Sequence, residues 1–451
     1  MRFIASKSVD MGNGPILPII LTLAIPAMIS MFFQNLYAVI DTVFISWLGA
    51  VPLAAQTFSI PLFYVALSLS KGVQVGTAAL ISHARGRGET EQVEAIVQAA
   101  LPLVLLCILP LFMLLIPGVC DAVFGLIGAR GEMLEQIYFY TFWLILGFPV
   151  MAYTMICEAN FMSHGNTVAP MQAMLLGNGA NLILAPTLMF GLDLGIAGAS
   201  LATLLGQALS AFYIGKKIKQ SGLFMPTLKW KAGILAIWKK IGRQGSLVAI
   251  TLLVSPLGLT LLNGVLSSFG AEALGAWNIM SRLAMLGLLP LNGMAASMIP
   301  FMSFNNAQMK VERVNEGIKY FLLLATVFIL PIIMIFIAFP HILLLLFQAE
   351  GKIMELGSYA VRVAALGYIL VPIDLALFSL AQGLQKPVYP LFTLILRILV
   401  FRYPLAVYFA ATWGVRSVYW CEPVSMGVAA IFSAFLLWRL TNGLKSVVSR
   451  Y

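Results

Sequence analysis

The chain has 451 residues, of which 61% are hydrophobic and only 10% are charged, and its mean hydropathy is +0.96. Soluble globular domains carry about 25% charged residues, so this composition excludes a soluble globule and predicts a polytopic membrane protein. The formal net charge of +10 does not indicate nucleic-acid binding. Its Lys and Arg residues fall in short segments between apolar runs, where the positive-inside rule accounts for them.

Twelve apolar runs are long enough to cross a bilayer as helices, which predicts an all-α integral membrane protein. They cover about residues 16–46, 53–83, 94–118, 134–161, 168–190, 196–215, 246–268, 273–303, 317–347, 357–382, 387–411 and 417–440. The first run is longer than a signal-peptide core, so we expect the polar segment before it to stay on the mature protein.

Alternate loops between these runs are rich in Lys and Arg. The rich set contains Arg85, Arg87, Lys310, Arg313, Lys386 and the basic segment 216–245, whereas the opposite set holds little beyond Arg130, Lys352 and Arg416. Basic loops stay in the cytoplasm. The pattern therefore predicts that both termini are cytoplasmic. We expect the membrane to be a prokaryotic plasma or inner membrane.

The basic segment 216–245 contains no acidic residue and lies midway along the chain. It predicts a cytoplasmic linker between an N-terminal lobe, 1–215, and a C-terminal lobe, 246–451. A weak internal repeat supports this division, because LGAVPLAAQ at 48–56 aligns with FGAEALGAW at 269–277. Each copy holds six spans, an even number, so the lobes are expected to be parallel and related by a pseudo-two-fold axis along the membrane normal, as in one class of secondary transporters.

The first apolar run carries a single carboxylate, Asp41, near its outer end. Polar side chains precede it at helical spacing and share its stripe: Ser30, Gln34 and Tyr37. A charged side chain at bilayer depth costs roughly 2.5–3.5 kcal/mol on insertion scales, so an intramembrane Asp is a functional candidate by default. The alternative is a structural acid that is paired to a neighbour or lies at the interface.

Lys71 is predicted near the middle of the second span, one turn from Gln74. Two interpretations stay open: Lys71 lines a cavity, or it pairs with an acid that the sequence does not identify. We expect no direct salt bridge from Lys71 to Asp41, because the two side chains differ in depth along their helices.

Spans five and six also carry polar residues at helical spacing, among them Asn178, Asn181 and Thr203. Together with the first-span stripe they predict a polar cavity inside the first lobe. The alternative for the small residues of these spans, such as Ser200 and Ser210, is helix packing.

In the second half, Asp374 is the only acid within span ten. It is a candidate second cation-binding group, or else the partner of Arg282 or Arg362.

Signatures of soluble enzymes are absent from the sequence: there is no P-loop, no HExxH and no GxSxG. The four cysteines show no CxxC or CxxH spacing, which indicates buried thiols. We therefore expect no enzymatic activity, no cofactor and no metal site. Without a nucleotide motif, transport must be driven by an ion gradient or be passive.

Several stretches of the chain resemble the multidrug and toxic-compound extrusion (MATE) family, specifically its DinF-like branch. They are LAIPAMISMFFQNLYAVIDTVFISWLGAVPLAA, GVQVGTAALISHARGRG, FMSHGNTVAPM and NLILAPTLMFGLDLGIAGASLATLLGQ. The resemblance implies two six-helix lobes around a V-shaped cavity, from which cationic or amphipathic compounds leave in exchange for protons or sodium. By position, Asp41 matches the coupling acid of that family. The residues that match the cavity neighbours of the family's acid are Gln34, Tyr37, Asn181 and Thr203.

One position departs from the family pattern. Ala185 stands where the branch often has an acid after Asn181, and span seven lacks the acid that is usual in the sodium-coupled branch. We therefore expect a monomeric antiporter of small cationic molecules that runs on protons rather than sodium. The alternative is a flippase-like exporter of a lipid-linked or anionic precursor, which Lys71, Arg282 and Arg397 leave open.

Overall fold

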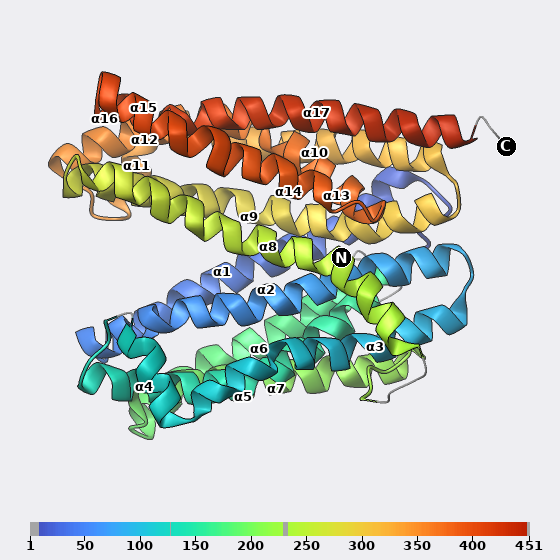
Figure 1. The fold of residues 1–451 in the computed structure, drawn as a ribbon, viewed down its shortest axis with the longest axis horizontal. Coiled ribbons are helices and arrows are strands. Elements are labelled where there is room, and N and C mark those ends of the chain that lie inside the picture. The colour runs from blue at the N-terminus through green and yellow to red at the C-terminus, as the bar shows by residue number, and fades with distance from the viewer. Residues whose placement is uncertain (1–8, 127, 229–232, 449–451) are drawn as a thin grey trace. The chain divides into compact units, whose positions relative to one another are not determined.

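Figure 1 shows a computed structural model of the chain, which describes residues 9–126, 128–228 and 233–448. Over these residues the chain forms α-helices with short 3-10 and π segments and no β-strand. It divides into two compact units. Unit 1 holds the residues up to Met11 together with Ile25–Ala249, and unit 2 holds Gly12–Ala24 together with Ile250–Tyr451.

Unit 1 contains most of the first helix and the whole of the next six. Its elements are α1 (Ile16–Ser46, from Ile25 onward), α2 (Ala50–Gly86), α3 (Thr90–Ile108) with the 3-10 segment η2 (Leu109–Leu115), α4 (Pro117–Leu126), α5 (Glu132–Ser163), α6 (Val168–Pro186) with the π segment η3 (Thr187–Gly191), α7 (Gly195–Gln220) and the first part of α8 (Ile234–Ser267).

Unit 2 contains the first turns of α1, the rest of α8 and all later helices. These are α9 (Ala271–Ala307), α10 (Val311–Ala338), α11 (Pro340–Leu345), α12 (Gly351–Tyr368), α13 (Val371–Gly383), α14 (Val388–Ile395) with the π segment η4 (Leu396–Arg402), α15 (Tyr403–Trp413), α16 (Val415–Val418) and α17 (Cys421–Val448).

Eleven helical stretches of the described chain are long and apolar enough to span a membrane, and the pair α12 and α13, bent by 47°, makes a twelfth. Six of these spans fall mainly in each unit. The predicted fold class, an all-α membrane protein of twelve spans in two six-helix lobes, is confirmed.

Some boundaries differ from the expectation. The span expected at 317–347 ends at Ala338, where Pro340 starts the separate helix α11 because proline cannot continue the hydrogen-bond ladder. Both ends of the expected linker 216–245 are helical, since α7 continues to Gln220 and α8 begins at Ile234. Residues 229–232 of that linker, with Lys229 and Lys231, lie outside the described residues. The domain boundaries at 215 and 246 stay predictions.

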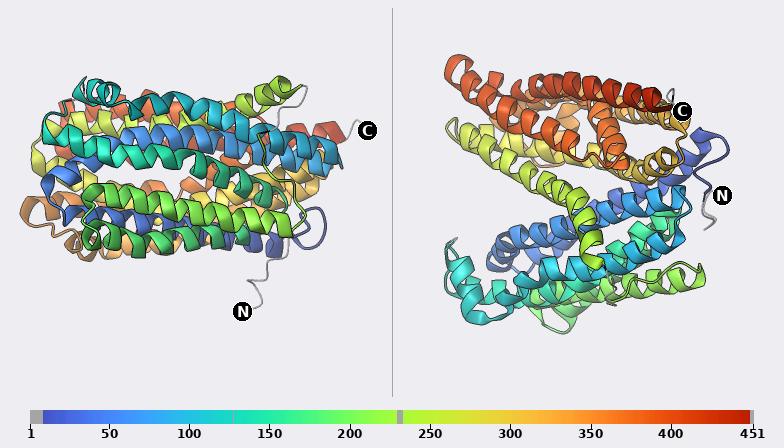
Figure 2. Two further views of the ribbon diagram at one scale, coloured as in Figure 1. Left: turned by 90° about the horizontal axis from the view of Figure 1, so that it is seen from below. Right: turned by 45° about the vertical axis from the view of Figure 1, so that its right-hand side comes forward.

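Glycines allow two helices of unit 1 to pack with their backbones in close contact. A Cβ added to Gly72 of α2 would lie 2.5 Å from the carbonyl oxygen of Gly245, and one added to Gly245 of α8 would lie 2.4 Å from that of Gly72. Gly76 approaches the Ile241 carbonyl in the same way. Small residues of this kind favour helix association in membranes. Lipid tails are as apolar as the helix surfaces, so close packing drives the association and the hydrophobic effect does not. This contact fixes α2, whose other side packs on α5 (Figures 1 and 2).

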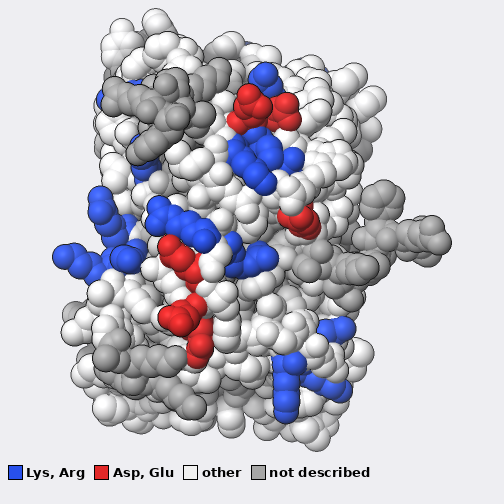
Figure 3. Space-filling view, turned by 90° about the vertical axis from the view of Figure 1, so that its right-hand side faces the viewer, with Lys and Arg blue, Asp and Glu red and all other residues white. Residues whose placement is uncertain are grey.

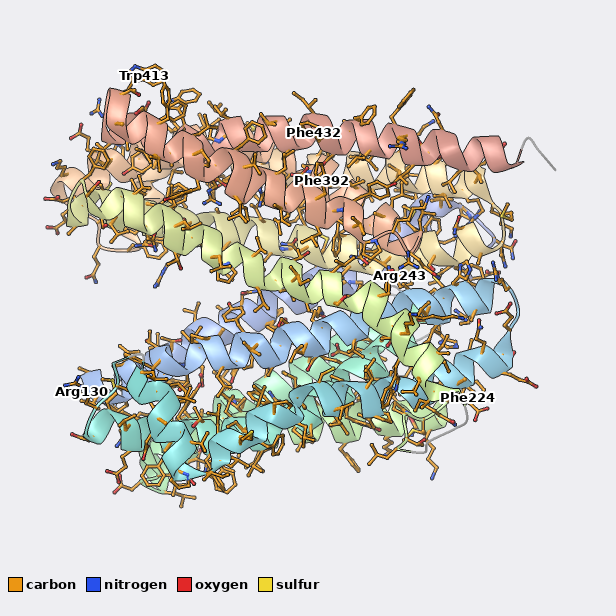
Figure 4. All side chains as sticks on the ribbon, viewed as in Figure 1. Arg130, Phe224, Arg243, Phe392, Trp413 and Phe432 are labelled. Atoms are coloured by element: carbon orange, nitrogen blue, oxygen red, sulfur yellow. The ribbon has the colours of Figure 1, made fainter. Side chains whose placement is uncertain are left out.

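Aromatic side chains of unit 2 form pairs both in its interior, as Trp277 and Tyr419 do, and at exposed positions, as Phe392 and Phe432 do. Trp277 of α9 is stacked on Tyr419, with ring centroids 6.4 Å apart and planes 7° apart, and the Tyr419 hydroxyl donates to the Ala273 carbonyl at 3.2 Å. Phe392 of α14 meets Phe432 of α17 edge to face at 6.4 Å (Figure 4). Such pairs add about 0.5–1.5 kcal/mol beyond the area they bury.

The glycine contact gives a stability prediction. Gly245→Ala places a methyl group against the Gly72 backbone, so we expect a loss of about 1–3 kcal/mol, as for other overpacked interiors. Gly242→Ala is the matched control on the same helix, because no atom lies within 4 Å of the Cβ it adds. The midpoint of thermal unfolding in detergent should fall for the first variant and hold or rise for the second. Equal midpoints would contradict the close contact.

Candidate functional site

A second close helix contact in unit 1 positions the polar residues of α6 and α7. A Cβ added to Gly177 would lie 2.7 Å from the Gly206 carbonyl oxygen, and the Ser210 hydroxyl donates across the contact to the Ala173 carbonyl. The Ser200 hydroxyl instead bonds its own helix at the Ala197 carbonyl. Ser200 and Ser210 therefore serve helix packing, as the alternative interpretation expected.

This contact brings Asn181 of α6 against Thr203 of α7. The Asn181 amide donates to the Thr203 hydroxyl at 3.1 Å, and the Tyr37 hydroxyl of α1 lies 3.3 Å from the same oxygen. Asn181 is 3% exposed, and its Oδ1 has no hydrogen-bond partner among the described atoms. Three of the predicted cavity residues thus form one small polar network on three helices.

Asp41 lies one helical turn beyond Tyr37 and is 8% exposed. Its Oδ2 accepts a long hydrogen bond of 3.4 Å from the Gln56 amide of α2, whereas its Oδ1 is buried without a hydrogen-bond partner among the described atoms. The Tyr37 and Tyr140 hydroxyls are both within electrostatic reach of this carboxylate, and Tyr140 also bonds Gln56. No ion pair of the described residues includes Asp41.

Sequence reasoning missed Gln56 and Tyr140, which come from α2 and α5. Gln56 carried a usable signal, since it is the one amide side chain in the outer half of the second span. Tyr140 carried none, because tyrosine is common at the ends of membrane spans.

Other predicted residues lie apart from this network. Gln34 is exposed on α1, and the Ser30 hydroxyl bonds its own helix at the Pro26 carbonyl. The Asn178 amide contacts the Met174 sulfur one turn away at 3.1 Å. Ala185 is fully buried, so the position where related chains often carry an acid is apolar here.

The acid near Lys71 is Glu158 of α5. Lys71 acts on Glu158 electrostatically, and Glu158 Oε2 accepts a 2.8 Å hydrogen bond from the Gln74 amide. The sequence did not identify this acid, because Lys71 and Glu158 belong to different helices that are distant along the chain.

In unit 2, Asp374 has two partners. The Ser433 hydroxyl of α17 donates to its Oδ1 at 2.6 Å, and Arg397 of η4 lies 3.8 Å from its Oδ2. The expected partners Arg282 and Arg362 are therefore replaced by Arg397. The Arg362 side chain instead donates to the Ile337 carbonyl.

A second ion pair of unit 2 was not foreseen. Arg402 Nε lies 2.8 Å from Glu422 Oε2, close enough for an ion pair but not aligned as a hydrogen bond, and both side chains are 9% exposed. The Arg402 guanidinium also sits 5.2 Å from the centroid of the Trp277 ring. Glu422 lies at the start of α17. Because it is an acid inside the expected span 417–440, the sequence indicated that it needs a partner.

Metal ligands do not gather among the described residues: no group of three or more His, Cys, Asp or Glu side chains could hold a metal ion. The four cysteines are free thiols.

Comparison with known families decides the class of the protein. The sequence profile of the MatE family matches residues 26–187 and 248–408, one stretch in each half of the chain. The chain belongs to the MatE family. This MATE protein is 24% identical over 452 residues to the FAD transporter of Shewanella oneidensis, with 97% of this chain and 98% of that protein covered.

Two further relatives agree with this assignment. The multidrug export protein MepA of Staphylococcus aureus is 24% identical, with 96% of each chain covered. A solved outward-facing structure of a multidrug resistance MATE family transporter superposes with a TM-score of 0.89 at 25% identity, covering 98% of this chain and 100% of that one. The family predicted from the sequence is confirmed, and the chain is a multi-span membrane transporter of the MATE family.

The buried ion pair gives a stability prediction. Glu422→Ala leaves the Arg402 charge buried without its partner, which typically costs about 3–5 kcal/mol. Glu355→Ala is the matched control, because the pair of Glu355 and Arg416 is 61% and 59% exposed and should contribute at most about 1 kcal/mol. Thermal unfolding of both purified variants checks the difference, and a double Arg402→Leu, Glu422→Leu variant should lose less than Glu422→Ala. An equal effect of the two single variants would show that the Arg402 charge is solvated.

Proposed function

We propose that this MATE protein exports cationic or amphipathic small molecules in exchange for protons, and that Asp41 is the group for which the two compete. The observation that supports the proposal is the state of this carboxylate. It is buried in unit 1, one oxygen has no partner, and no described cation is paired with it. Such a group can accept either a proton or an organic cation.

Competition at one carboxylate makes exchange obligatory. Burial favours the neutral, protonated form of a carboxyl group because the charged form loses its hydration. A proton that binds Asp41 removes the negative charge that holds a cation, and loss of the proton restores it. The amide of Gln56 donates to the carboxylate at 3.4 Å and so favours the charged form.

The polar network beside Asp41 favours protons over sodium. Sodium is held by several hard oxygen ligands, and Ala185 provides none. The Asn181 and Thr203 oxygens remain, so an acid at position 185 should complete a sodium site. His164 does not contribute to pH dependence near neutrality, since burial and the nearby Arg85 lower its pKa to about 4.

An anionic substrate is the second candidate, because the relative from Shewanella oneidensis is named an FAD transporter. An anionic substrate needs positively charged side chains that are not already paired with acids. Lys71 has Glu158 close by and Arg397 has Asp374, which leaves Arg282 of α9 as the exposed cation of the three. The charges therefore favour a cationic substrate, and FAD uptake by vesicles is the measurement that separates the candidates.

The orientation of the chain is also part of the proposal: both termini face the cytoplasm. The face drawn in Figure 3, which is the side of Figure 1 where α2 and α3 connect, displays Lys and Arg side chains together with several Asp and Glu side chains. Basic connections stay on the cytoplasmic side. A single cysteine placed at Ser221 should be protected from an impermeant thiol reagent in intact cells and react in inverted vesicles. Labelling in intact cells would reverse the orientation.

Transport in proteoliposomes tests the coupling. An imposed pH gradient should drive cationic-dye movement by the wild type, and Asp41→Asn should abolish it because the amide cannot exchange a proton. Asp193→Asn, at an exposed position between α6 and α7, is the matched control and should transport at the parental rate. Asp374→Asn should lower transport if Asp374 contributes to cation binding.

Sodium gradients provide the opposite arm of the same experiment. Ala185→Asp should increase sodium dependence by adding a carboxylate beside Asn181. Wild-type efflux that follows a sodium gradient and ignores a pH gradient would falsify proton coupling.

A further inference from the structure

An open pocket of about 510 Å³ lies at one end of unit 2, where α15, α16 and the start of α17 meet α12 (Figure 1). Its apolar walls are mostly aromatic and are formed by Tyr359, Phe409, Trp413, Trp420 and Val424. Among the described residues that line it, Arg416 is the one charged side chain. A concave site with apolar walls and a few placed polar groups is the usual form of a small-molecule site, so this pocket is a candidate binding site.

The walls of the pocket are held by contacts within the protein. Trp420 Nε1 donates to the Tyr359 hydroxyl at 2.9 Å, which joins the start of α17 to α12. The Ser417 hydroxyl donates to the Phe409 carbonyl at 3.0 Å, and the rings of Phe409 and Trp413 are stacked with centroids 5.4 Å apart. A preformed site loses little side-chain freedom when a ligand binds, so more of the contact energy is kept as affinity.

The pocket lies at the ends of two membrane spans. Helix α15 ends at Trp413 and α17 begins at Cys421, and both belong to helical stretches that are long and apolar enough to cross a membrane. Trp413 is 67% exposed at this end of unit 2 (Figure 4). Exposed Trp and Tyr side chains at the ends of spans lie at the level of the lipid headgroups. The pocket therefore opens where headgroups and acyl chains meet.

Arg416 makes the pocket suitable for an anion. Its guanidinium lies 5.7 Å from the centroid of the Tyr359 ring and forms an ion pair with Glu355, whose side chain is exposed. An exposed pair contributes little stability, so another anion can replace the carboxylate at small cost. Guanidinium and phosphate match in shape and form two parallel hydrogen bonds. A cationic ligand would instead meet the like charge of Arg416.

We propose that this pocket binds a phospholipid, with the phosphate on Arg416 and an acyl chain against the aromatic walls. The phosphate replaces Glu355 as the partner of the guanidinium, and the chain covers apolar side chains such as Trp413. The bilayer supplies this ligand at the depth at which the pocket opens. Under the orientation proposed above, the lipid comes from the outer leaflet. The site belongs to unit 2 and does not involve Asp41, so it does not rest on the proposed coupling.

Unfolding of the purified full-length chain in detergent, with added dioleoyl phosphatidylglycerol, tests the site. A lipid that binds only the folded state raises the unfolding midpoint as its concentration exceeds its dissociation constant. Arg416→Gln should raise the apparent dissociation constant by about tenfold or more, as for the loss of hydrogen bonds to a charged group. Arg130→Gln, an exposed arginine of unit 1, is the matched control and should leave it unchanged. Glu355→Gln should lower it, because the carboxylate no longer competes with the phosphate.

Two partial ligands separate the contributions of phosphate and chain. Dioleoylglycerol has the acyl chains without the phosphate, and inorganic phosphate has no chains, so each should stabilise the fold less than the lipid does. Phosphatidylglycerol with brominated chains gives a second readout, because bromine quenches the fluorescence of an indole that it touches. Trp413→Phe keeps an aromatic wall and should lose part of this quenching, and Arg416→Gln should require more lipid to reach it.

Asp41→Asn, which stops transport under the proposed function, should keep the lipid response, so the two proposals fail separately. The site is overturned if Arg416→Gln and Arg130→Gln bind the lipid equally, or if either partial ligand stabilises the fold as well as the lipid does. Displacement of the lipid by the cation tetraphenylphosphonium would also overturn it, since the pocket would then bind cations.

Discussion

The cost of placing charge and unpaired polar groups in a bilayer is the constraint on which this structure depends. It makes every span a helix, because only a helix satisfies the backbone within one segment. It also makes a partner inside the same unit favourable for an ionisable side chain of a span, as Arg402 has in Glu422 and Asp374 has in Arg397 and Ser433. Asp41 differs from these two, since its carboxylate receives one long hydrogen bond and no cation.

Helix packing determines which polar groups can meet. The backbones of α6 and α7 approach at Gly177 and Gly206, and this contact brings Asn181 to Thr203 one turn away. Likewise Gly72 and Gly245 hold α2 against α8, while the opposite side of α2 presents Gln74 to α5. In both places glycines position residues whose polar side chains meet across two helices.

The sequence predicted the number of spans and singled out Asp41 as a candidate because both depend on local information: apolar length, and one acid in an apolar helix. It could not pair charges on helices that are distant along the chain. The acid near Lys71, which is Glu158, was not identified, and the pairing alternative for Asp374 named Arg282 and Arg362 instead of Arg397. Both pairings depend on which helix faces meet. The break between α12 and α13 was missed for a different reason: both halves are apolar, so hydropathy reads them as one span.

The two units therefore differ in how they treat buried charge. In unit 2 the acids Asp374 and Glu422 each have an arginine within ion-pair distance. A transported cation would have to displace an arginine that other contacts hold in place, as the Trp277 ring holds Arg402. In unit 1 Asp41 has no such competitor, and the cation near Glu158 is a flexible lysine rather than an arginine fixed by a planar fork. Exchange of one positive charge for another is easier where the resident cation is absent or mobile, which supports the proposal that exchange takes place in unit 1.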